Sequence, residues 1–422
     1  MKNLVTPRVL EVLAEVEESV GDVLDAKTMP KEVYADEEFY RFEQEAIFAR
    51  SWMSLGRVDQ VSKPGDYVRI DVDKEPLLIV RGSDNKVRVL SAVCAHRGCL
   101  VAEGSGNLGK IIRCPLHAWT YGFDGELLGA PGMEPTGSVE QLRAQGMRLP
   151  ELRTEEWNGF LFVNLDPDAA PLRPTLGKLE REFANYHMDE LVSMPTVDLP
   201  GCKWNWKGML ENGIEPYHTA YLHHTIHDWA HARLASFVDW DDNDGAIYHP
   251  TGSYQPDGGF NATERAFFPT ISTLGEKERQ QILFATIPPT MFMGAMPDYV
   301  FYYLIMPVSP DEMNLRIGMC YPESTTQLPM FERLHEATVH GIEMFVEQDN
   351  WADVLVQQGQ HSRFRTRGRY SFQEETLVQQ NRWLLKRYRD YVNLETGGRY
   401  EELMSDIRKT KGIERSLSGG RP

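Results

Sequence analysis

The sequence predicts an α+β protein of two domains, in which a small all-β domain precedes a larger domain of helices and strands. The first observation is a series of short β-type runs between about residues 56 and 165, punctuated by Gly, Pro and Asp. The second is a change to long helical stretches and strand-like runs after the Pro- and Ala-rich linker Asp166–Pro174. The length of 422 residues agrees with two or three domains.

The N-terminal stretch predicts two helices before the β-domain begins. Residues 5–24 carry valine and leucine at spacings of three and four, which is typical of an amphipathic helix. Residues 36–52 begin at the acidic residue Asp36 and carry several buried-type aromatic side chains, which indicates a second helix. We expect residues 1–35 to pack on the larger C-terminal part, residues 36–165 to form the β-domain and residues 166–422 to form the α+β domain.

The remaining elements follow from local patterns. In the β-domain, strands are expected at Tyr67–Val72, Pro76–Arg81, Val87–Ala92, Ile111–Cys114 and Gly159–Asn164. In the α+β domain, helical stretches are expected near 176–188, 207–235, 329–358 and 373–393, and strands near 281–293, 299–308 and 313–320.

Composition excludes several function classes. Lys and Arg total 44 against 62 Asp and Glu, and a net charge of −18 disfavours nucleic acid and anionic membranes as partners. Five cysteines do not make a disulfide framework in a chain of this length, and they favour a reducing compartment. The N-terminus has no basic stretch leading into an apolar core, and no apolar run approaches the ~20 residues of a membrane-spanning helix. A cytoplasmic protein is expected.

Four metal-ligand side chains lie close together in the β-domain. Cys94-Ala-His96 is followed, after seventeen intervening residues, by Cys114-Pro-Leu-His117. From composition, this pattern arises by chance in roughly 1 in 10,000 sequences. Two thiolates and two imidazoles can hold a zinc ion or a two-iron two-sulfur cluster.

The context of the two ligand pairs resembles the cluster-binding loops of Rieske proteins. The stretches read CAHRGCL and CPLHAWTYGFDGEL, and each pair lies on a loop between β-type runs. The resemblance implies a [2Fe-2S] cluster held by Cys94, His96, Cys114 and His117. Cys99, Cys202 and Cys320 lie outside the pattern and are interpreted as small buried residues or free thiols.

A second candidate set follows the linker. Glu215-x2-His218-x4-His223 offers two imidazoles and a carboxylate, the ligand types of non-haem iron oxygenases. Such a trio arises by chance about 0.05 times in a chain of this composition. His223, His227 and His231 compete, because a spacing of four stacks them on one helical face, whereas His218 and His223 lie about 140° apart on an ideal helix.

The Rieske loops, the linker and the segment WKGMLENGIEPYHTAYLH together resemble the α-subunit of Rieske non-haem iron oxygenases, which include the aromatic-ring-hydroxylating dioxygenases. The resemblance runs from about Tyr34 to Tyr391. It implies a helix-grip catalytic domain, an antiparallel sheet with helices, that binds a mononuclear Fe(II) through His218 and His223.

The same resemblance implies a carboxylate as third iron ligand. In the stretch FVEQDNWADVLVQQG, Asp349 lies eight residues before Gln357, as the family pattern requires, with Glu347 and Asp353 as alternatives. Glu215 is then not a ligand. It holds the position of the family's acidic residue that bridges a Rieske histidine of one subunit to an iron histidine of the next.

The resemblance further implies the terminal component of an oxygenase, which uses O2 and electrons from a reductase, often through a ferredoxin. We expect a homotrimer, with or without a β-subunit, acting on a small organic and in the first instance aromatic substrate. A hydroxylase or N-demethylase of quaternary ammonium compounds or N-methyl amines is the alternative, because Glu at position 215 and the short loop before it are commoner in that branch. From another class, an electron-transfer protein would need only the Rieske domain.

One aromatic and methionine-rich run, Pro289–Met306, is the sole hint at a substrate pocket. Its members could line a site for a planar ring, cage a quaternary ammonium by cation–π attraction, or belong to the core of a sheet. The members considered are Met291, Phe292, Met293, Met296, Tyr302 and Tyr303. No Arg is placed so as to argue for a carboxylate substrate.

Overall fold

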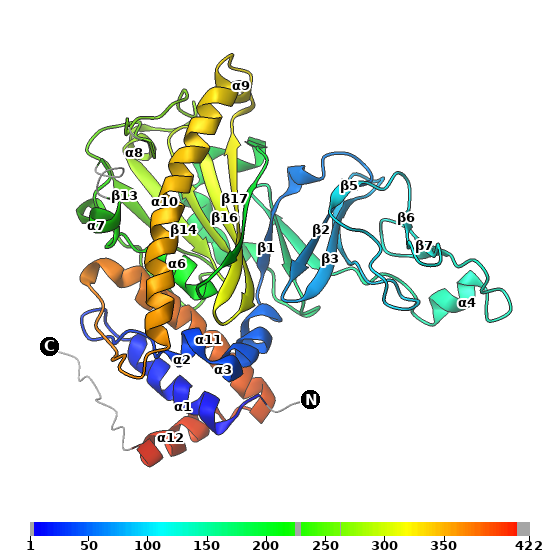
Figure 1. Cartoon of the computed structure of the whole chain (residues 1–422), viewed down its shortest axis with the longest axis horizontal. Coiled ribbons are helices and arrows are strands. Elements are labelled where there is room, and N and C mark those ends of the chain that lie inside the picture. Colours follow the sequence, from blue (N-terminus) through cyan, green and yellow to red (C-terminus); the bar gives the residue numbers. More distant parts are fainter. Residues whose placement is uncertain (1–3, 224–228, 262, 412–422) are drawn as a thin grey trace.

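A computed structural model describes residues 4–223, 229–261 and 263–411 of the chain. Its long axis runs from a helix-rich part, which contains both ends of the described chain, to a β-domain that projects to one side (Figure 1). The predicted α+β class with an N-terminal β-domain is confirmed.

The β-domain contains three small antiparallel sheets. The first has the order β4-β3-β2-β5, the second β6-β7-β8 and the third β1-β10-β9. The bounds are β1 Met53–Arg57, β2 Asp66–Val72, β3 Glu75–Arg81, β4 Val87–Ser91, β5 Ser105–Asn107, β6 Ile112–Arg113, β7 Thr120–Tyr121, β8 Leu127–Gly129, β9 Arg153–Trp157 and β10 Phe160–Asn164, with one helix, α4, at Val139–Ala144. The strand positions predicted from sequence agree with these bounds to within a residue or two.

Within the β-domain, the segment 58–159 begins and ends at the same place, next to the paired strands β1 and β10. Strand β1 pairs with β10, and the backbone N–H of Val58 donates to the carbonyl of Gly159 at 3.0 Å. Residues 58–159 therefore form an excursion whose two ends meet.

The C-terminal domain is built on a seven-stranded antiparallel sheet. Its path is β11-β17-β16-β15-β14-β13, and β12 pairs with β17 beside β11. The bounds are β11 Val192–Ser193, β12 Val197–Cys202, β13 Ile247–Gly252, β14 Gln281–Ile287, β15 Met291–Ala295, β16 Val300–Ser309 and β17 Glu312–Tyr321.

Alternation of side chains gives this sheet two different faces. One face packs on α6 (Trp206–Ile214), α10 (Phe331–Gln360) and α11 (Glu375–Thr396), and Figure 1 shows α10 lying along it. The opposite face packs on Trp157, Phe160 and Phe162 of the β1-β10-β9 sheet and on residues 172–191. Short helices complete the domain: α5 Gly177–Glu182, α7 Thr219–Leu222, α8 Glu276–Arg279, α9 Glu323–Thr326 and α12 Tyr400–Lys411.

The N-terminal helices pack on the C-terminal domain. Helix α1 (Pro7–Val16) contacts α11 and α12, and α2 (Glu32–Ala35) contacts α10. The second predicted helix, 36–52, is α3 (Glu37–Glu43) continued by a π-helical turn, Gln44–Phe48, with Asp36 as the N-cap. The predicted domain limits, 1–35, 36–165 and 166–422, stay a prediction.

A buried ion pair ties α3 to α6. The Lys207 ammonium lies 2.8 Å from a carboxylate oxygen of Glu43, and both side chains are fully buried. The Tyr388 hydroxyl of α11 donates to the same carboxylate. Removing one member would leave an unpaired buried charge, so the pair fixes how the three helices dock.

No helix among the described residues combines the length and apolar character needed to cross a lipid bilayer.

Candidate metal centres

The two predicted cluster-binding loops have the same backbone geometry. In the first, Cys94 N–H donates to the carbonyl of Cys99 at 2.8 Å and Gly98 N–H to that of Cys94 at 3.0 Å. In the second, Cys114 N–H donates to Trp119 at 2.8 Å and Ala118 N–H to Cys114 at 3.0 Å. Four positions after each of these two cysteines, the backbone adopts the left-handed conformation, with φ of 72° at Gly98 and 55° at Ala118. The chain thus presents two copies of one ligand loop.

The side chains of these loops fit a cluster with two thiolates and two imidazoles. Cys94 and Cys114 are each 2% exposed, and burial, together with the neighbouring Cys114, raises the pKa of the Cys94 thiol. The rings of His96 and His117 lie 4.7 Å apart. Nδ1 of His96 is buried without a hydrogen-bond partner among the described residues, a condition that a metal bond would relieve.

The break in helix geometry that His218 and His223 require comes from Pro216. Because the residue before a proline avoids the helical region, Glu215 is extended (φ −105°, ψ 130°) and α6 ends at Ile214. The chain then forms the four-residue helix α7, with His218 as its N-cap and His223 as its C-cap. The helix predicted over 207–235 is therefore wrong as a continuous element.

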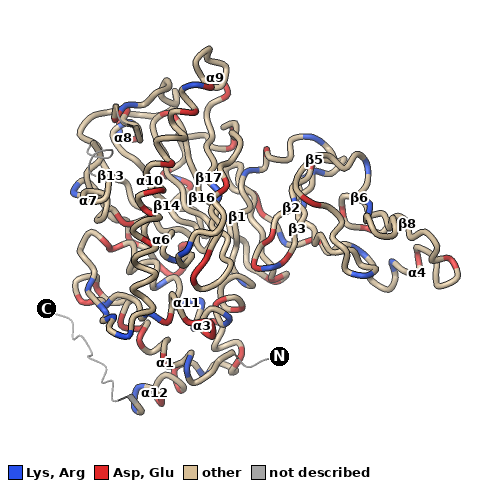
Figure 2. Tube along the Cα trace, in the orientation of Figure 1, with Lys and Arg blue, Asp and Glu red and all other residues tan. Residues whose placement is uncertain are grey.

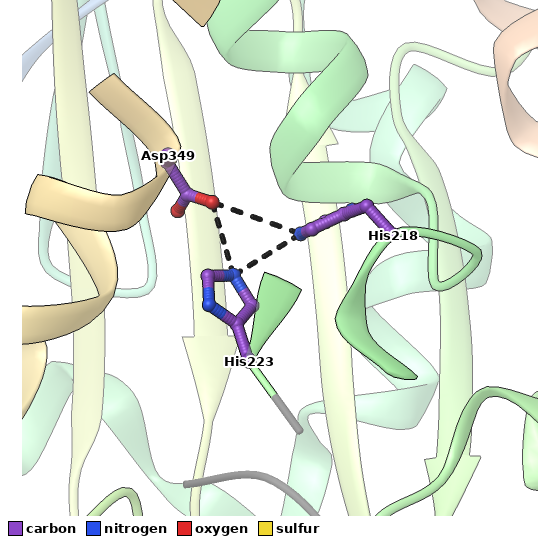
Figure 3. A group of neighbouring side chains, drawn as sticks. All are labelled: His218, His223 and Asp349. Atoms are coloured by element: carbon purple, nitrogen blue, oxygen red, sulfur yellow. Dashed lines mark hydrogen bonds and ion pairs between the residues drawn. The ribbon is translucent and has the colours of Figure 1, made fainter. Parts of the chain in front are cut away.

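This break brings three ligand atoms together. Nε2 of His218 lies 3.2 Å from Nε2 of His223, and Oδ1 of Asp349 lies 3.8 Å and 3.0 Å from these two atoms (Figure 3). A point equidistant from the three atoms is about 2.0 Å from each, the length of a metal–imidazole bond. The geometry fits one metal ion with two imidazoles and one carboxylate on the same side.

Each imidazole is oriented from behind by a side-chain oxygen. Nδ1 of His218 lies 2.7 Å from Oε1 of Glu215, whose Oε2 also accepts the backbone N–H of His218 at 3.0 Å. Nδ1 of His223 lies 2.7 Å from Oε1 of Gln348. A carboxylate or amide oxygen can only accept, so both Nδ1 atoms carry a proton, and Nε2 is the nitrogen through which each ring would bind a metal.

The electrostatics of the site favour a positive charge at the same point. Burial opposes a charge on His218, yet the carboxylates of Glu215 and Asp349 raise its pKa to about 9. A cation placed between the three ligand atoms would therefore be stabilised by the same carboxylates.

The alternative ligands lie elsewhere. Glu347 is exposed on α10, and it is not among the residues that the geometry groups as a possible metal site. Asp353 lies one turn beyond Asp349, and burial raises its pKa well above the usual value. Of the competing set His223/His227/His231, His227 lies outside the described residues, and His231 accepts the backbone N–H of Arg233 through Nδ1. Asp349 remains the carboxylate that we predict.

The structure adds two residues that sequence reasoning did not assign. Gln348 orients His223, and Asn212 donates to Oδ1 of Asp349 at 3.2 Å. The sequence signal for Gln348 is its position directly before Asp349, where members of the family usually have a second acidic residue. Gln357, used above only to align Asp349, is buried and binds the backbone of Tyr34 and Asn205, which fixes α10 against α6 and α2.

A cavity opens beside the three ligand atoms, on the helix-covered face of the sheet. Its apolar lining is mainly aromatic: Phe260, Phe284, Phe292, Phe301, Tyr303 and Phe345, with Met209 and Ile342. Of the six members singled out in the run Pro289–Met306, Phe292 and Tyr303 line the cavity, and Phe301 of the same run, which was not singled out, lines it as well. Met291, Met293 and Tyr302 alternate to the opposite face, where they belong to the other core, and Met296 is buried away from the lining.

A second cavity of about 260 Å³ lies behind His218 and is acidic. It is lined by Glu211, Glu215, Asp353 and Glu374, together with Tyr34 and Gln357. Burial raises the pKa of Glu211 and of Glu374 to about 7.

Two family models match the chain. The ring hydroxylating alpha subunit (catalytic domain) matches residues 180–390, and the Rieske [2Fe-2S] domain matches residues 51–145. Among curated proteins, the carnitine monooxygenase oxygenase subunit of Escherichia coli (strain K12) is 33% identical over 203 residues, 47% of this chain and 53% of that protein. The biphenyl 2,3-dioxygenase subunit alpha of Rhodococcus jostii (strain RHA1) is 31% identical over 213 residues, 49% of this chain and 45% of that protein. The chain matches about half the length of these relatives.

Solved structures agree on the fold. A quaternary ammonium Rieske monooxygenase in complex with L-carnitine superposes with a TM-score of 0.73 at 22% identity, covering 88% of this chain and 98% of that one. Naphthalene 1,2-dioxygenase from Rhodococcus sp., bound to indole, gives 0.72 at 18% identity, covering 90% and 99%.

Proposed function

The chain belongs to the ring-hydroxylating alpha-subunit family and carries a Rieske [2Fe-2S] domain, and from that premise we propose that it is the terminal oxygenase component of a Rieske non-haem iron oxygenase. Its cofactors are a [2Fe-2S] cluster and a mononuclear iron. The activity we propose is hydroxylation or dihydroxylation of a small organic substrate with O2 and electrons from a reductase, directly or through a ferredoxin.

The arrangement of His218, His223 and Asp349 carries this proposal. His218, His223 and Asp349 would hold a metal from one side, beside the aromatic cavity, so a substrate and O2 would meet on its other side. When bound, the iron supplies the redox chemistry that activates O2. The chain's residues hold the two imidazole tautomers, position the substrate against the open side and exclude water with the phenylalanine lining.

Iron quantitation tests the proposal against a pure electron carrier. An oxygenase binds three irons per chain, two in the cluster and one in the triad, and the reduced protein consumes O2 when substrate is present. Two irons per chain, with a reducible cluster and no O2 uptake on any substrate, would instead identify an electron-transfer protein.

We further propose that electrons pass between neighbouring chains of a homotrimeric ring. Strands β6 and β7, which frame the second cluster-binding loop, lie at the end of the molecule opposite α7, so the two centres of one chain are far apart (Figure 1). In a head-to-tail ring, each cluster can face the iron of the next chain.

The charges of the two ends support this arrangement. Arg97, Lys110 and Arg113 are exposed around the cluster-binding loops, whereas the cavity behind His218 is acidic, and Figure 2 shows acidic residues recurring along α10. Val356, which lines that cavity, is exposed, and so are Trp351 on the same helix and Phe372, two residues before the lining residue Glu374. Glu215 lies between the cavity and His218, where it would accept a hydrogen bond from a neighbour's Rieske histidine.

Mixed rings test transfer between chains. Chains with Cys94→Ser and chains with His218→Ala are each inactive alone, and co-assembly restores activity if a cluster on one chain feeds an iron on the next. Glu215→Gln keeps both metal centres and slows turnover severely. A fully active monomer, or no rescue in verified mixed rings, contradicts the proposal.

Two substrate classes are proposed for this site. The name of the biphenyl dioxygenase relative suggests ring compounds, and that of the carnitine monooxygenase relative suggests N-methyl amines.

The mass of the purified assembly decides whether a β-subunit joins the ring. We place the protein in the cytoplasm, because the proposed cluster needs Cys94 and Cys114 as thiolates in a reducing compartment.

A further inference from the structure

The cavity beside the three proposed iron ligands is small. Its volume is about 60 Å³, whereas an apolar cavity that takes up benzene measures about 150 Å³. A benzene ring, or a trimethylammonium group of similar bulk, therefore does not fit while the wall stays as it is. Because protein interiors are close-packed, a substrate of either proposed class can enter only if part of the wall moves.

One aromatic ring of the wall lies outside the regular elements. The other five lie on β14, β15, β16 or α10: Phe284, Phe292, Phe301, Tyr303 and Phe345. Phe260 belongs to the irregular segment 253–261, which follows β13. Strand and helix residues are fixed by regular backbone hydrogen bonds, whereas segments outside them open at lower cost. Phe260 is therefore the ring whose displacement disrupts the fold least.

The closed position of Phe260 fills the space between α10 and the sheet. Its ring lies 4.8 Å from that of Phe345 and 5.9 Å from that of Phe301, and the residue is 5% exposed. Its carbonyl oxygen lies so close to α10 that a Cβ at Gly341 would be 2.3 Å away. Moving Phe260 away from α10 would enlarge the cavity on this side.

The backbone before Phe260 is suited to such a movement. Asp257 adopts the left-handed conformation, with φ of 56°, which is uncommon for a residue other than glycine. Gly258 and Gly259 follow it, and glycine has the widest backbone freedom of any residue. In the closed position Gly258 packs under Trp229, where a Cβ would lie 2.3 Å from the indole ring. The segment is thus closely packed but carries its own hinge.

An ion pair at the surface holds the segment closed. The Arg279 guanidinium of α8 donates to both carboxylate oxygens of Asp257, through Nε at 2.8 Å and through a terminal nitrogen. The backbone N–H of Asp257 also donates to the carbonyl of Arg279 at 2.8 Å. The Arg279 side chain is 42% exposed, so water screens the pair and its stabilisation is small. The Asp257–Arg279 pair is a latch that opens readily.

We propose that Phe260 sets the size of the substrate that the cavity admits, and that a substrate enters by displacing the segment 253–261, with the Asp257–Arg279 pair as its latch. In the bound state the substrate takes part of the space that the Phe260 ring fills when the segment is closed. This inference rests on the proposed function, because it takes the cavity as the substrate site. It applies equally to ring compounds and to N-methyl amines.

Probes of one chemistry and two sizes test the role of Phe260. The holoenzyme is titrated calorimetrically with benzene and naphthalene, and with tetramethylammonium and tetraethylammonium. In Phe260→Ala, the larger member of at least one pair should bind at least about tenfold more tightly than to the unmodified chain, since no ring has to be displaced. Tyr254→Ala is the control, because Tyr254 belongs to the same segment but is exposed and does not line the cavity. Unchanged or weaker binding of both larger probes to Phe260→Ala overturns the inference.

The latch is tested without altering the wall. Arg279→Gln should tighten binding of the same larger probe by about fivefold, because opening no longer breaks an ion pair. Lys277→Gln is the matched control: Lys277 lies on the same helix and loses an ion pair with Glu182 at 2.9 Å, which does not hold the segment. Both substitutions are at the surface, so this test remains available if Phe260→Ala does not fold. An equal effect of the two variants contradicts the latch.

Hydrogen exchange locates the movement. Saturation of the holoenzyme with naphthalene or tetraethylammonium, whichever binds, should speed amide exchange in residues 253–261 and leave β14, β15 and β16 unchanged. Slower exchange in 253–261 would mean that the segment stays closed over the probe, and would overturn the inference.

The outcomes separate this inference from the proposed function. If a substrate stimulates O2 uptake but binding moves no part of 253–261, the role of Phe260 is wrong and the oxygenase assignment stands. If the segment responds as expected but the reduced holoenzyme takes up no O2 with compounds of any class, the oxygenase assignment fails and the role of Phe260 in ligand entry stands.

Discussion

In the β-domain the four predicted cluster ligands lie within residues 94–117, whereas the three predicted iron ligands span residues 218–349 and meet only through the docking of α10 beside α7. The cluster loops are fixed by their own backbone hydrogen bonds. The iron triad depends on helix packing and on Glu215 and Gln348 behind the imidazoles. A local site therefore tolerates changes elsewhere in the fold, and an assembled site does not.

The largest expected effect is loss of one centre without the other. Asp349→Ala should lower the affinity for the mononuclear iron by more than about 100-fold and abolish O2 uptake. The loss should exceed the roughly 10–100-fold that is typical when a residue hydrogen-bonded to a metal ligand is removed, because Asp349 is itself a proposed ligand. The cluster spectrum should stay unchanged. The exposed neighbour Glu347→Ala is the control and should keep both centres. Full activity of Asp349→Ala would move the third ligand to Glu347 or Asp353.

The converse change acts on the β-domain. Cys114→Ser should remove the visible absorption and the electron paramagnetic resonance signal of the cluster, because a hydroxyl replaces a thiolate ligand, and leave one iron per chain. Cys202→Ser should alter neither, since Cys202 lies in β12 on the C-terminal sheet. Loss of both centres in Cys114→Ser would show that the two sites are not independent.

A smaller effect is expected behind His223. In Gln348→Leu, Nδ1 of His223 loses its partner and the ring loses its fixed tautomer, so iron affinity should fall about 10–100-fold. Metal titration of the apo-protein measures this. Gln348→Glu, which keeps an acceptor, should restore binding, and failure of Glu to rescue would assign Gln348 a packing role only.

The smallest effect concerns the loop backbone. Gly98→Ala should destabilise the β-domain by about 1 kcal/mol, because its left-handed φ of 72° is unfavourable for a side chain although the space is open. Gly21→Ala, which has neither a left-handed φ nor a neighbour in reach, is the control. Urea titrations followed by cluster absorption compare them. An unchanged midpoint for Gly98→Ala would mean that the loop adapts.

The same contrast explains how much the sequence could predict. Ligands held by short loops leave a short-range pattern, so spacing indicates Cys94, His96, Cys114 and His117 as a metal-ligand set, and the resemblance of the two loops to Rieske loops implies a [2Fe-2S] cluster. The spacing of His218 and His223 conflicted with a continuous helix. The signal that resolves it, Pro216, was present in the sequence but shows its effect only once Glu215 is seen to be extended.

Contacts made by tertiary packing were out of reach. Nothing in the stretch around Gln348 specifies that its side chain meets His223, because that depends on how α10 docks. Likewise, Pro289–Met306 is predicted to line a site for a planar ring, to cage a quaternary ammonium or to belong to the core of a sheet, but which of its members line the cavity depends on strand register. Register assigns Phe292 and Tyr303 to one side and Tyr302 to the other.

The backbone hydrogen bond between Val58 and Gly159 brings the two ends of the segment 58–159 together, which matters for protein engineering and for evolution. A segment whose ends adjoin can be exchanged as a unit, because β1 and β10 pair with each other outside it. The exchanged part includes β9 and Trp157, so it must keep their packing on β10 and on the C-terminal sheet. We expect chimaeras that receive residues 58–159 from a relative to keep the cavity beside His218 and His223 and to change the proposed cluster and its surroundings. Recombination at residues 58 and 159 would therefore allow the cluster-bearing segment and the domain with the cavity to be inherited from different ancestors.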